Sequence, residues 1–273
     1  MKAVVIGGGT MGAGIAHLLL AGGHHVWLVE ADAERAHAGF LGVKSSLHKA
    51  EAKGKLNGGD ADELLENLTV GEPPADAELV VEAVPENVPL KQKVLGDAAA
   101  KCPDAVLTSN TSSLSIADIA EGLPGERVLG MHFFNPVPVQ QLVELVHHDG
   151  VDPANVAKVR TWAEELGKTV IEVRDSPGFA TSRLGVAVGM EAIRMVEEGV
   201  ASAADIDTGM KLGYRWPMGP LELTDLVGLD VRLAIAENLA EQLGPRFEPP
   251  RLLRDKVARN ELGKKTGQGF FSW

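Results

Sequence analysis

The chain has 273 residues, enough for one or two domains with a full hydrophobic core. Its formal net charge of −12 at pH 7 disfavours nucleic acid as a partner, because proteins that bind a phosphate backbone usually present a basic face. No apolar run approaches the roughly 18 residues of a membrane span, so no membrane segment is expected. The single cysteine, Cys102, excludes an internal disulfide and fits a reducing compartment, and we expect a cytoplasmic protein.

The first 20 residues have the pattern of a dinucleotide-binding turn. Residues 3–6 form a short apolar run typical of a buried strand, and residues 15–20 have helical spacing. In the GGGTMG stretch between them, the first glycine permits a tight turn, the third lets backbone approach a pyrophosphate, and the last lets helix and strand pack closely. The helix N-terminus adds free N–H groups and a positive dipole end. The candidate cofactor-binding residues are Gly7, Gly9, Thr10, Met11 and Gly12.

An acidic residue follows the second predicted strand, residues 25–29. Glu30 lies about 20 residues after the glycines, where a carboxylate can accept hydrogen bonds from the adenosine ribose hydroxyls. A negative charge there repels a 2′-phosphate, so the position favours NAD over NADP. The alternative is a solvated residue at a strand end, and the preceding glycines favour the cofactor role.

Residues 32–55 predict a long helix, or a pair of helices, that carries the densest basic run in the first half of the chain. Composition alone favours a solvated helix face. The alternative is a site for an anionic part of the substrate. The run ends at Leu56, where Asn57-Gly58-Gly59 predicts a turn. The basic residues are Arg35, Lys44, Lys49, Lys53 and Lys55.

Strands and helices alternate through the next hundred residues. Strands are expected at 68–70, 78–84, 105–109 and 169–173, with helices at about 88–101 and 153–166. This alternation predicts an α/β fold with a doubly wound parallel sheet. The polar run 109–113 (SNTSS) closes one of these strands, where such sheets bind ligands. Ser113 or Ser115 could instead cap a helix near residues 116–121, and both roles stay open.

The stretch 128–146 contains two apolar, β-prone runs joined by a loop with Asn135, Pro136 and Pro138. Two antiparallel strands here would place His132, at the end of the first run, beside Glu144, inside the second. A histidine held by a buried carboxylate is a poised general base, because the carboxylate fixes its tautomer and stabilises the imidazolium. For a pair taken alone, a structural histidine is the better interpretation. The dinucleotide signature upstream favours catalysis.

The pattern changes at DSPGF, which begins at Asp175. No β-rich run follows, and residues 180–198, 202–212, 229–243 and 250–260 have helical spacing. The sequence therefore predicts two domains, an α/β domain of residues 1–175 and an all-α domain of residues 176–273. The long apolar helices of the second domain suggest packing against the first domain, another subunit, or both.

Eight collinear motifs carry a family resemblance along essentially the whole chain. They are GGGTMGAGIA, VVEAVPEN, SNTSSLSI, HFFNPVPVQQLVEL, DSPGF, DIDTGMKLG, PMGPLELTDLVGLD and KKTGQGFF. Together they resemble the L-3-hydroxyacyl-CoA dehydrogenase family, including its short bacterial 3-hydroxybutyryl-CoA dehydrogenases. The resemblance implies an N-terminal Rossmann-like NAD-binding domain and a helical C-terminal domain that forms a homodimer. It also implies reversible oxidation of (3S)-3-hydroxyacyl-CoA to 3-oxoacyl-CoA.

The resemblance also implies roles for single residues. The family's catalytic histidine and glutamate match His132 and Glu144, and its active-site serine, near the nicotinamide and the thioester, matches Ser112. Positions near NAD match Glu86, Lys91, Asn110, Ser112, Asn135 and Lys265. Contacts to coenzyme A match Ser46 and Lys53.

One position departs from the family pattern. An asparagine usually follows the PGF motif in a sequence such as PGFxxNR, but PGFATSR places Ser182 there. A serine donates one hydrogen bond, is shorter and lacks the second group of the amide. We expect Ser182 to contact the substrate and to affect which substrate is preferred.

Two other functions compete with this prediction. One is an NAD-dependent dehydrogenase of a CoA-free hydroxy acid such as L-gulonate, which would not need the basic helical segment. The other is a non-catalytic NAD-binding protein, which predicts a damaged catalytic pair, whereas His132, Glu144 and Ser112 are all present. No metal site is expected under any of the three.

Overall fold

The structure, a computed structural model, describes residues 1–56 and 59–273. The turn predicted at Asn57 and Gly58 lies outside the described residues. The chain divides into two compact units, Met1–Asp175 and Ser176–Trp273. Among the described residues, no helix is both long enough and apolar enough to cross a membrane.

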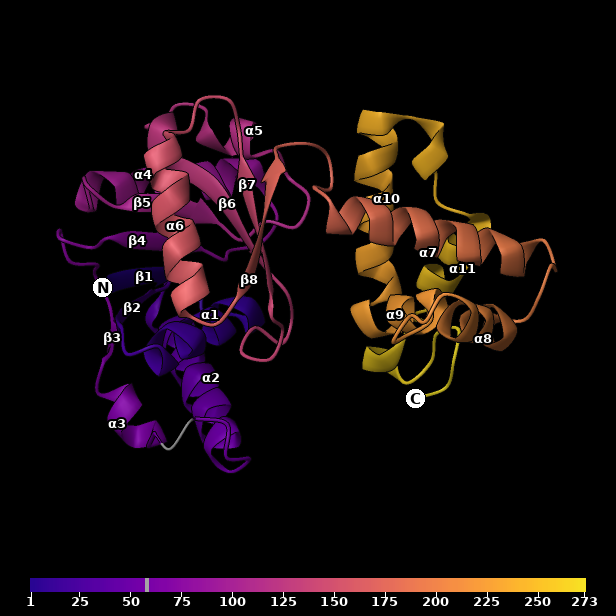
Figure 1. The fold of residues 1–273 in the computed structure, drawn as a ribbon, viewed down its shortest axis with the longest axis horizontal. Helices are drawn as coiled ribbons and strands as arrows, with labels where there is room; N and C mark the ends of the chain where they lie inside the picture. Colours follow the sequence, from indigo (N-terminus) through magenta and orange to yellow (C-terminus); the bar gives the residue numbers. More distant parts are fainter. Residues whose placement is uncertain (57–58) are drawn as a thin grey trace. The chain divides into compact units, whose positions relative to one another are not determined.

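The first unit is built on an eight-stranded sheet with the order β3-β2-β1-β4-β5-β6-β7-β8 (Figure 1). Neighbouring strands from β3 to β6 are parallel, β7 is antiparallel to β6, and β8 is parallel to β7. The chain starts in the middle of the sheet, runs outward to β3 and returns beside β1 as β4. This order confirms the predicted doubly wound α/β class, and it creates the switch point between β1 and β4 where such sheets bind ligands. The strands are β1 (Lys2–Ile6), β2 (His25–Val29), β3 (Leu68–Val70), β4 (Leu79–Glu82), β5 (Val106–Ser109), β6 (Val128–Phe133), β7 (Leu142–His147) and β8 (Thr169–Arg174).

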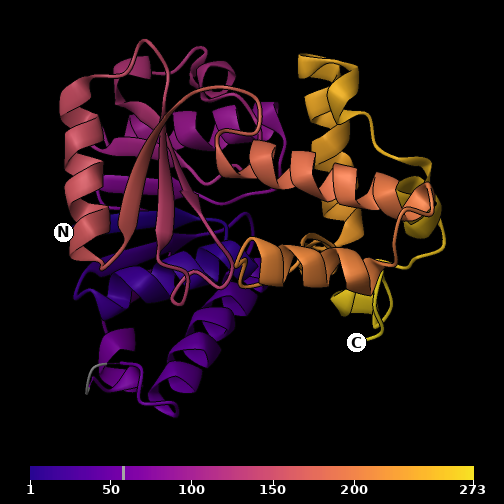
Figure 2. The same cartoon turned by 45° about the vertical axis from the view of Figure 1, so that its right-hand side comes forward.

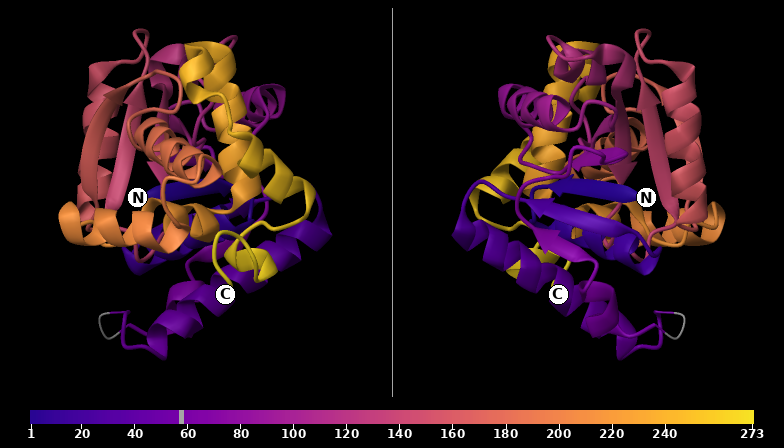
Figure 3. Two further views of the ribbon diagram at one scale, coloured as in Figure 1. Left: turned by 90° about the vertical axis from the view of Figure 1, so that its right-hand side faces the viewer. Right: turned by 90° about the vertical axis from the view of Figure 1, so that its left-hand side faces the viewer.

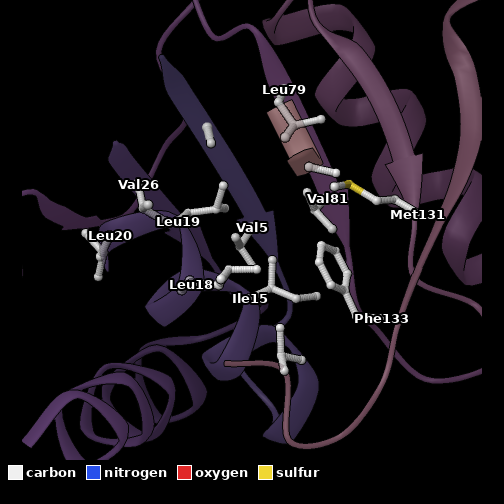
Figure 4. Packing of buried hydrophobic residues seen from close by; sticks show 14 of the residues in the cluster. Val5, Ile15, Leu18, Leu19, Leu20, Val26, Leu79, Val81, Met131 and Phe133 are labelled. Carbon is white, nitrogen blue, oxygen red and sulfur yellow. The ribbon is translucent and has the colours of Figure 1, made fainter. Parts of the chain in front are cut away.

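Helices cover the sheet on both faces. The buried residues of α1 form one apolar cluster with side chains from β1, β4 and β6 (Figure 4). The same cluster includes residues of α6 and β7, and α6 lies along β7 and β8 (Figure 3). Helices α4 and α5 contact β4, β5 and β6. Alternate residues of each strand therefore enter different layers, as the pleat of a strand requires. The helices of this unit are α1 (Thr10–Ala21), α2 (Ala33–Glu51), α3 (Ala61–Leu65), α4 (Val88–Lys101), α5 (Ile116–Ala120), the short η1 (Gly125–Arg127) and α6 (Pro153–Glu165).

Helix α2 ends four residues earlier than the sequence predicted. It begins at the cap Asp32, whose carboxylate accepts the N–H of Arg35 at 2.8 Å, and its last residue is Glu51. Gly54 then adopts φ +64, a left-handed conformation that glycine takes without steric cost and that commonly ends helices. Lys53 and Lys55 therefore lie in the turn after the helix, and not on its face.

The second unit contains helices and connecting segments only, within the described residues (Figures 1 and 2). Its core includes Val186, Met190 and Ile193 of α7 together with Leu221 and Leu239. The predicted helical spans are confirmed within one or two residues at most ends. Its helices are α7 (Thr181–Glu197), α8 (Ala203–Gly213), α9 (Pro220–Val227), α10 (Leu229–Leu243), η2 (Pro245–Phe247), α11 (Arg251–Ala258) and η3 (Lys264–Thr266).

Helix α9 is an addition to the prediction. It begins with Pro220 directly after Gly219, and the buried carboxylate of Asp207 accepts the N–H groups of Leu221 and Glu222 at 2.9 and 2.8 Å. The cap thus comes from the preceding helix α8 and not from a local serine or aspartate. Because the start of α9 reads locally as a Pro/Gly turn, sequence spacing alone did not reveal it.

Candidate active site

The glycine-rich turn lies between β1 and α1, at the carboxyl ends of the parallel strands. Gly7 has φ +98, and a Cβ on it would lie 2.9 Å from the carbonyl oxygen of Ala83, the residue after the neighbouring strand β4. A Cβ on Gly12 would lie 1.7 Å from the carbonyl oxygen of Gly7, so helix and strand approach too closely for any side chain. In contrast, a Cβ on Gly9 would meet nothing within 4 Å. The turn therefore leaves open space above Gly9.

The N-terminus of α1 is open to a ligand. Its cap, Gly9, has no side chain to accept a hydrogen bond, and the first N–H that bonds within the helix is that of Ala13, which donates to the oxygen of Gly9. The N–H groups of Thr10, Met11 and Gly12 precede that bond, where helices leave their donors unsatisfied. Open space, unsatisfied N–H groups and a positive dipole end fit the pyrophosphate of a dinucleotide.

The carboxylate of Glu30 is tied to the same turn. Its Oε1 accepts the N–H of Gly8 at 2.6 Å, and its Oε2 accepts the N–H of Ala31 at 3.2 Å. Glu30 is therefore fixed beside the glycines and is not a freely solvated strand end. Each carboxylate oxygen has a second lone pair, so the same group can also accept hydroxyl donors.

A buried ion pair lies at the end of β4, next to this turn. The Nζ of Lys91 donates to Glu82 Oε1 at 2.8 Å and to the oxygen of Val84 at 3.1 Å, and it lies 3.4 Å from Glu86 Oε2. Lys91 is 1% exposed and Glu82 is fully buried. The second oxygen of Glu82 accepts the hydroxyl of Ser109 at 2.6 Å, so this carboxylate also joins β4 to β5.

Glu82 was not among the residues singled out from the sequence. The signal was present in the VVEAV stretch, where a charged residue interrupts an apolar run that reads as a strand buried on both faces. A charge in such a strand must be paired or must ligate something, because an unpaired buried charge is very costly.

Glu86 extends this network to the polar loop after β5. Its Oε1 accepts the hydroxyl of Thr111 at 3.0 Å and the backbone N–H of Ser112 at 2.7 Å. Asn110 in turn accepts the N–H of Phe133 through its Oδ1 at 2.8 Å, which links the loop to β6. The loop that carries Ser112 is thus fixed by hydrogen bonds to Glu86 on one side and to β6 on the other.

The helix cap in this region is Ser115, whose hydroxyl oxygen accepts the N–H of Asp118 at 3.2 Å. The same hydroxyl donates to the carboxylate of Asp175 at 2.9 Å. Of the two alternatives for capping α5, Ser115 is therefore the residue used. Ser112 takes no part in the cap.

His132 and Glu144 lie directly opposite each other in the antiparallel pair β6–β7, as expected from the sequence. The imidazole Nδ1 lies 2.7 Å from Glu144 Oε2, His132 is 4% exposed, and Glu144 is fully buried. Because an ionised carboxylate only accepts, the proton of this bond belongs to Nδ1, and the imidazole lone pair is on Nε2. The ring also packs against Phe134 at a centroid distance of 4.5 Å.

His17 and Lys168 are buried polar residues near Ser46, a candidate contact to coenzyme A. The hydroxyl of Ser46, on α2, lies 2.7 Å from Nδ1 of His17, on α1. Burial, and then the positive charge of Lys168, lowers the pKa of His17 to about 4. Lys168 donates to the carbonyl oxygens of Val137 and Gln140, both at 2.7 Å, which fixes the loop that carries Asn135.

The other predicted site residues lie outside these networks. Lys53 is exposed in the turn after α2, and Asn135 is exposed in the loop between β6 and β7. In the helical unit, Ser182 lies in the first turn of α7, and Lys265 forms an ion pair with Asp230 at 2.6 Å. Within the described ranges, no group of three His, Cys, Asp or Glu side chains is arranged to hold a metal ion.

Comparison with known proteins places this geometry in a family. Residues 2–176 match the model of the 3-hydroxyacyl-CoA dehydrogenase NAD binding domain, and residues 178–273 match that of the 3-hydroxyacyl-CoA dehydrogenase C-terminal domain. The chain belongs to the 3-hydroxyacyl-CoA dehydrogenase family. This membership confirms the predicted family, its class as an oxidoreductase and NAD as its cofactor.

Curated relatives and solved structures agree over nearly the full length. The chain is 40% identical to the 3-hydroxybutyryl-CoA dehydrogenase of Mycobacterium tuberculosis, with 98% of this chain and 97% of the relative covered. It is 39% identical to the probable 3-hydroxybutyryl-CoA dehydrogenase of Bacillus subtilis, with 99% and 96% covered. The crystal structure of (S)-3-hydroxybutyryl-CoA dehydrogenase PaaH1 from Ralstonia eutropha aligns with a TM-score of 0.92 at 37% identity, with 100% and 98% covered.

The Glu82–Lys91 pair predicts a non-additive effect on stability. Lys91→Met or Glu82→Gln alone should lower the free energy of unfolding by roughly 3 kcal/mol, because each leaves an uncompensated buried charge or a lost charged hydrogen bond. The double variant should recover part of that loss. Urea unfolding of the four proteins measures the coupling, and two strictly additive losses would contradict a paired role.

The low pKa of His17 predicts a stability that falls in mild acid. The folded-state pKa of about 4 lies below the ordinary 6.5, so protonation favours the unfolded chain. This contribution is complete near neutral pH and is lost as the pH falls from about 6.5 towards about 4. Between pH 7 and pH 5, His17→Asn should lose roughly 2 kcal/mol less stability than the original chain. Urea unfolding at pH 7, 6 and 5 checks this, and parallel losses in the two proteins would contradict it.

Proposed function

We propose that this protein oxidises (3S)-3-hydroxyacyl-CoA to 3-oxoacyl-CoA with NAD⁺, and catalyses the reverse reaction. The observation that carries the proposal is the buried pair of His132 and Glu144, 2.7 Å apart, on the same sheet as the glycine-rich turn. The names of the relatives make the four-carbon ester, 3-hydroxybutyryl-CoA, the first substrate to test.

The N-terminal unit supplies the cofactor contacts in this proposal. The pyrophosphate would be held by the N-terminus of α1, above Gly9, and the ribose hydroxyls would donate to Glu30. When bound, NAD⁺ would supply the acceptor for the hydride from C3 of the substrate. The negative charge of Glu30 disfavours a 2′-phosphate in the same place. Asn135 and Lys265 are proposed as further contacts on the cofactor side.

His132 carries the proton in the proposed reaction. Its Nε2 accepts the proton of the 3-hydroxyl group while hydride leaves C3, and the imidazolium that forms is stabilised by Glu144 through Nδ1–H. In the direction of reduction, the same imidazolium donates its proton to the oxygen that develops at C3. Because the pair is buried, the charge interaction between the two side chains is screened less than it would be in water.

The network around Glu82 serves to position the loop of Ser112. Glu86 accepts the backbone N–H of Ser112, and Lys91 holds Glu86 and Glu82 together. We assign Ser112 a hydrogen bond to the substrate near the thioester and the nicotinamide. Lys91 is buried against protein oxygens, so we assign it a positioning role that acts through Glu86. We assign Asn110 a positioning role that acts through its hydrogen bond to β6. The remaining substrate contacts proposed are Ser46 and Lys53, for coenzyme A, and Ser182, for the acyl part.

The helical unit is proposed as the dimerisation unit. Several large apolar side chains are exposed on it, including Leu184, Leu212 and Tyr214 at 67%, 79% and 74%. An open groove of about 330 Å³ between α7, α8 and α9 is lined almost wholly by apolar side chains, among them Ala187, Met195 and Met210. Exposed apolar surface of this kind is typical of a subunit interface, and a second copy of this chain is the partner we propose.

The proposed compartment is the cytoplasm. Cys102 is buried and forms no disulfide, which is compatible with a reducing environment.

The function is tested by oxidation of NADH with acetoacetyl-CoA and with free acetoacetate. We expect turnover of the CoA ester, and His132→Gln should reduce kcat by about 10² to 10⁴ while NADH binding is unchanged, because it removes the proton carrier and not the cofactor site. His25→Gln, at an exposed position on β2, is the matched control and should keep full activity.

Two results would contradict this assignment. Near-normal turnover by His132→Gln would remove His132 from the chemistry. Turnover of free acetoacetate but not of its CoA ester would favour the CoA-free hydroxy acid dehydrogenase instead.

The role of Glu30 predicts a change in cofactor preference. Glu30→Gln keeps an acceptor for the N–H of Gly8 but removes the negative charge, so the ratio of kcat/KM for NADH over NADPH should fall about tenfold. The KM for acetoacetyl-CoA should change little, which serves as the internal control. An unchanged NADH/NADPH ratio would count against Glu30 as the ribose-binding residue.

A further inference from the structure

A buried lysine holds the β6–β7 connection, residues 134–141. Lys168, which directly precedes β8, is 7% exposed, and its Nζ donates to the carbonyl oxygens of Val137 and Gln140, both at 2.7 Å. Within the described part of the chain, no carboxylate forms an ion pair with this lysine. A charged donor forms hydrogen bonds about twice as strong as those of a neutral donor. The two contacts therefore fix the connection, although burial of an unpaired charge is costly.

The same connection packs against helix α1. Val137 is buried, and a Cβ on Gly14 of α1 would lie 3.0 Å from the Cβ and 3.1 Å from the Cγ2 of Val137. The absence of a side chain at Gly14 thus lets the connection approach the helix closely. Gly14 is two residues after Gly12, near the end of the helix that we propose as the pyrophosphate site. The connection is therefore fixed by hydrogen bonds to Lys168 and by packing on α1.

The connection begins next to the proposed base. Its first residue, Phe134, packs against the imidazole of His132 at a centroid distance of 4.5 Å. In the proposed reaction, His132 takes a proton from the oxygen on C3 while hydride leaves C3, so the nicotinamide must approach C3 to about 3 to 3.5 Å. Asn135 is three residues after His132, which is at most about 10 Å of extended chain. The start of the connection is therefore the part of this unit that we expect to border the nicotinamide.

We propose that Lys168 is a positioning residue for hydride transfer. It acts through the β6–β7 connection, which it fixes so that the nicotinamide meets a preformed surface beside His132. A preformed surface spares the cofactor the free energy of ordering a loop on binding. The adenosine half of the cofactor is proposed to bind at the glycine turn and Glu30, which do not contact Lys168. The inference rests on the proposed function, because it requires His132 to lie beside the nicotinamide.

The test compares the binding of NADH with that of ADP-ribose, which lacks the nicotinamide. Lys168→Met removes the charge and the donors but keeps a long, unbranched side chain. It should raise the Kd for NADH about tenfold and lower kcat with acetoacetyl-CoA by a similar factor, because the connection is no longer fixed. The Kd for ADP-ribose should change less than about twofold. Lys158→Met, at an exposed position on α6, is the matched control and should change none of these values.

A second variant tests the same connection without a change at Lys168. Gly14→Ala adds a methyl group 3.0 Å from Val137 and should displace the connection, so it should also weaken the binding of NADH more than that of ADP-ribose. Because both substitutions act through one connection, the loss in the double variant should be smaller than the product of the two single losses. Titration calorimetry measures both dissociation constants, at a temperature at which circular dichroism shows the variants folded. Gly14→Ala carries the same test should Lys168→Met fail to fold.

Two results would overturn the inference. One is an equal loss of affinity for NADH and ADP-ribose in both variants. The other is a loss of stability with unchanged NADH affinity and unchanged kcat, which is the outcome for a residue that only supports the fold. Absence of NADH oxidation by the original chain with acetoacetyl-CoA would instead overturn the proposed function.

Discussion

The antiparallel pairing of β6 with β7 is the constraint on which the candidate site depends. Every other neighbouring pair in the sheet is parallel, and only this reversal places His132 opposite Glu144. A slip of one residue would turn the carboxylate to the other face, because side chains alternate along a strand. The register is set by the apolar residues that flank His132 on β6 and Glu144 on β7. Met131, Phe133, Val143 and Leu145 all point into the core with α1 and α6, so His132 and Glu144 point to the opposite face. Burial of those apolar side chains thus holds the proposed base and its carboxylate together.

Buried charges occur in both units, but within the described ranges only the N-terminal unit contains an ion pair between two of them. In the N-terminal unit, Lys91 and Glu82 are each surrounded by protein partners, and together with Glu86 they hold two strand ends and one loop. Both charges are compensated by partners within the fold. In the helical unit, the buried Nε of Arg232 has no hydrogen-bond partner among the described residues. A fully satisfied network of buried charges rigidifies the structure, whereas an unpaired buried charge destabilises it. Lys91 is therefore assigned a positioning role.

Features that depend on local sequence could be predicted. The glycine turn, the strands and the opposition of His132 and Glu144 follow from spacing, apolar runs and the chemistry of glycine. The family resemblance then supplied Ser112, Glu86 and Lys91, which spacing alone does not single out. Features that depend on distant partners could not be predicted in this way. The cap of α9 is Asp207, thirteen residues before Pro220, and the buried charge of Glu82 has meaning only beside Lys91 and Ser109. The early end of α2 depends on one glycine with a positive φ, at Gly54, within an otherwise helical pattern.

The net charge of −12 is compatible with a function that requires two negatively charged ligands, NAD and a CoA ester. At physiological salt the Debye length is about 8 Å, so charges spread over the surface act weakly on a ligand compared with groups in direct contact. The pyrophosphate would meet backbone N–H groups of α1, which carry no formal charge and leave the overall balance unchanged. The basic residues of α2 and the turn after it are gathered in one segment, where they can act on a single phosphate group without a basic face. His17, close to that segment, is neutral at pH 7 because burial and Lys168 lower its pKa, so it contributes a hydrogen bond to Ser46 without adding charge. Selective binding of anions therefore depends on a few placed donors, and an acidic surface is compatible with it.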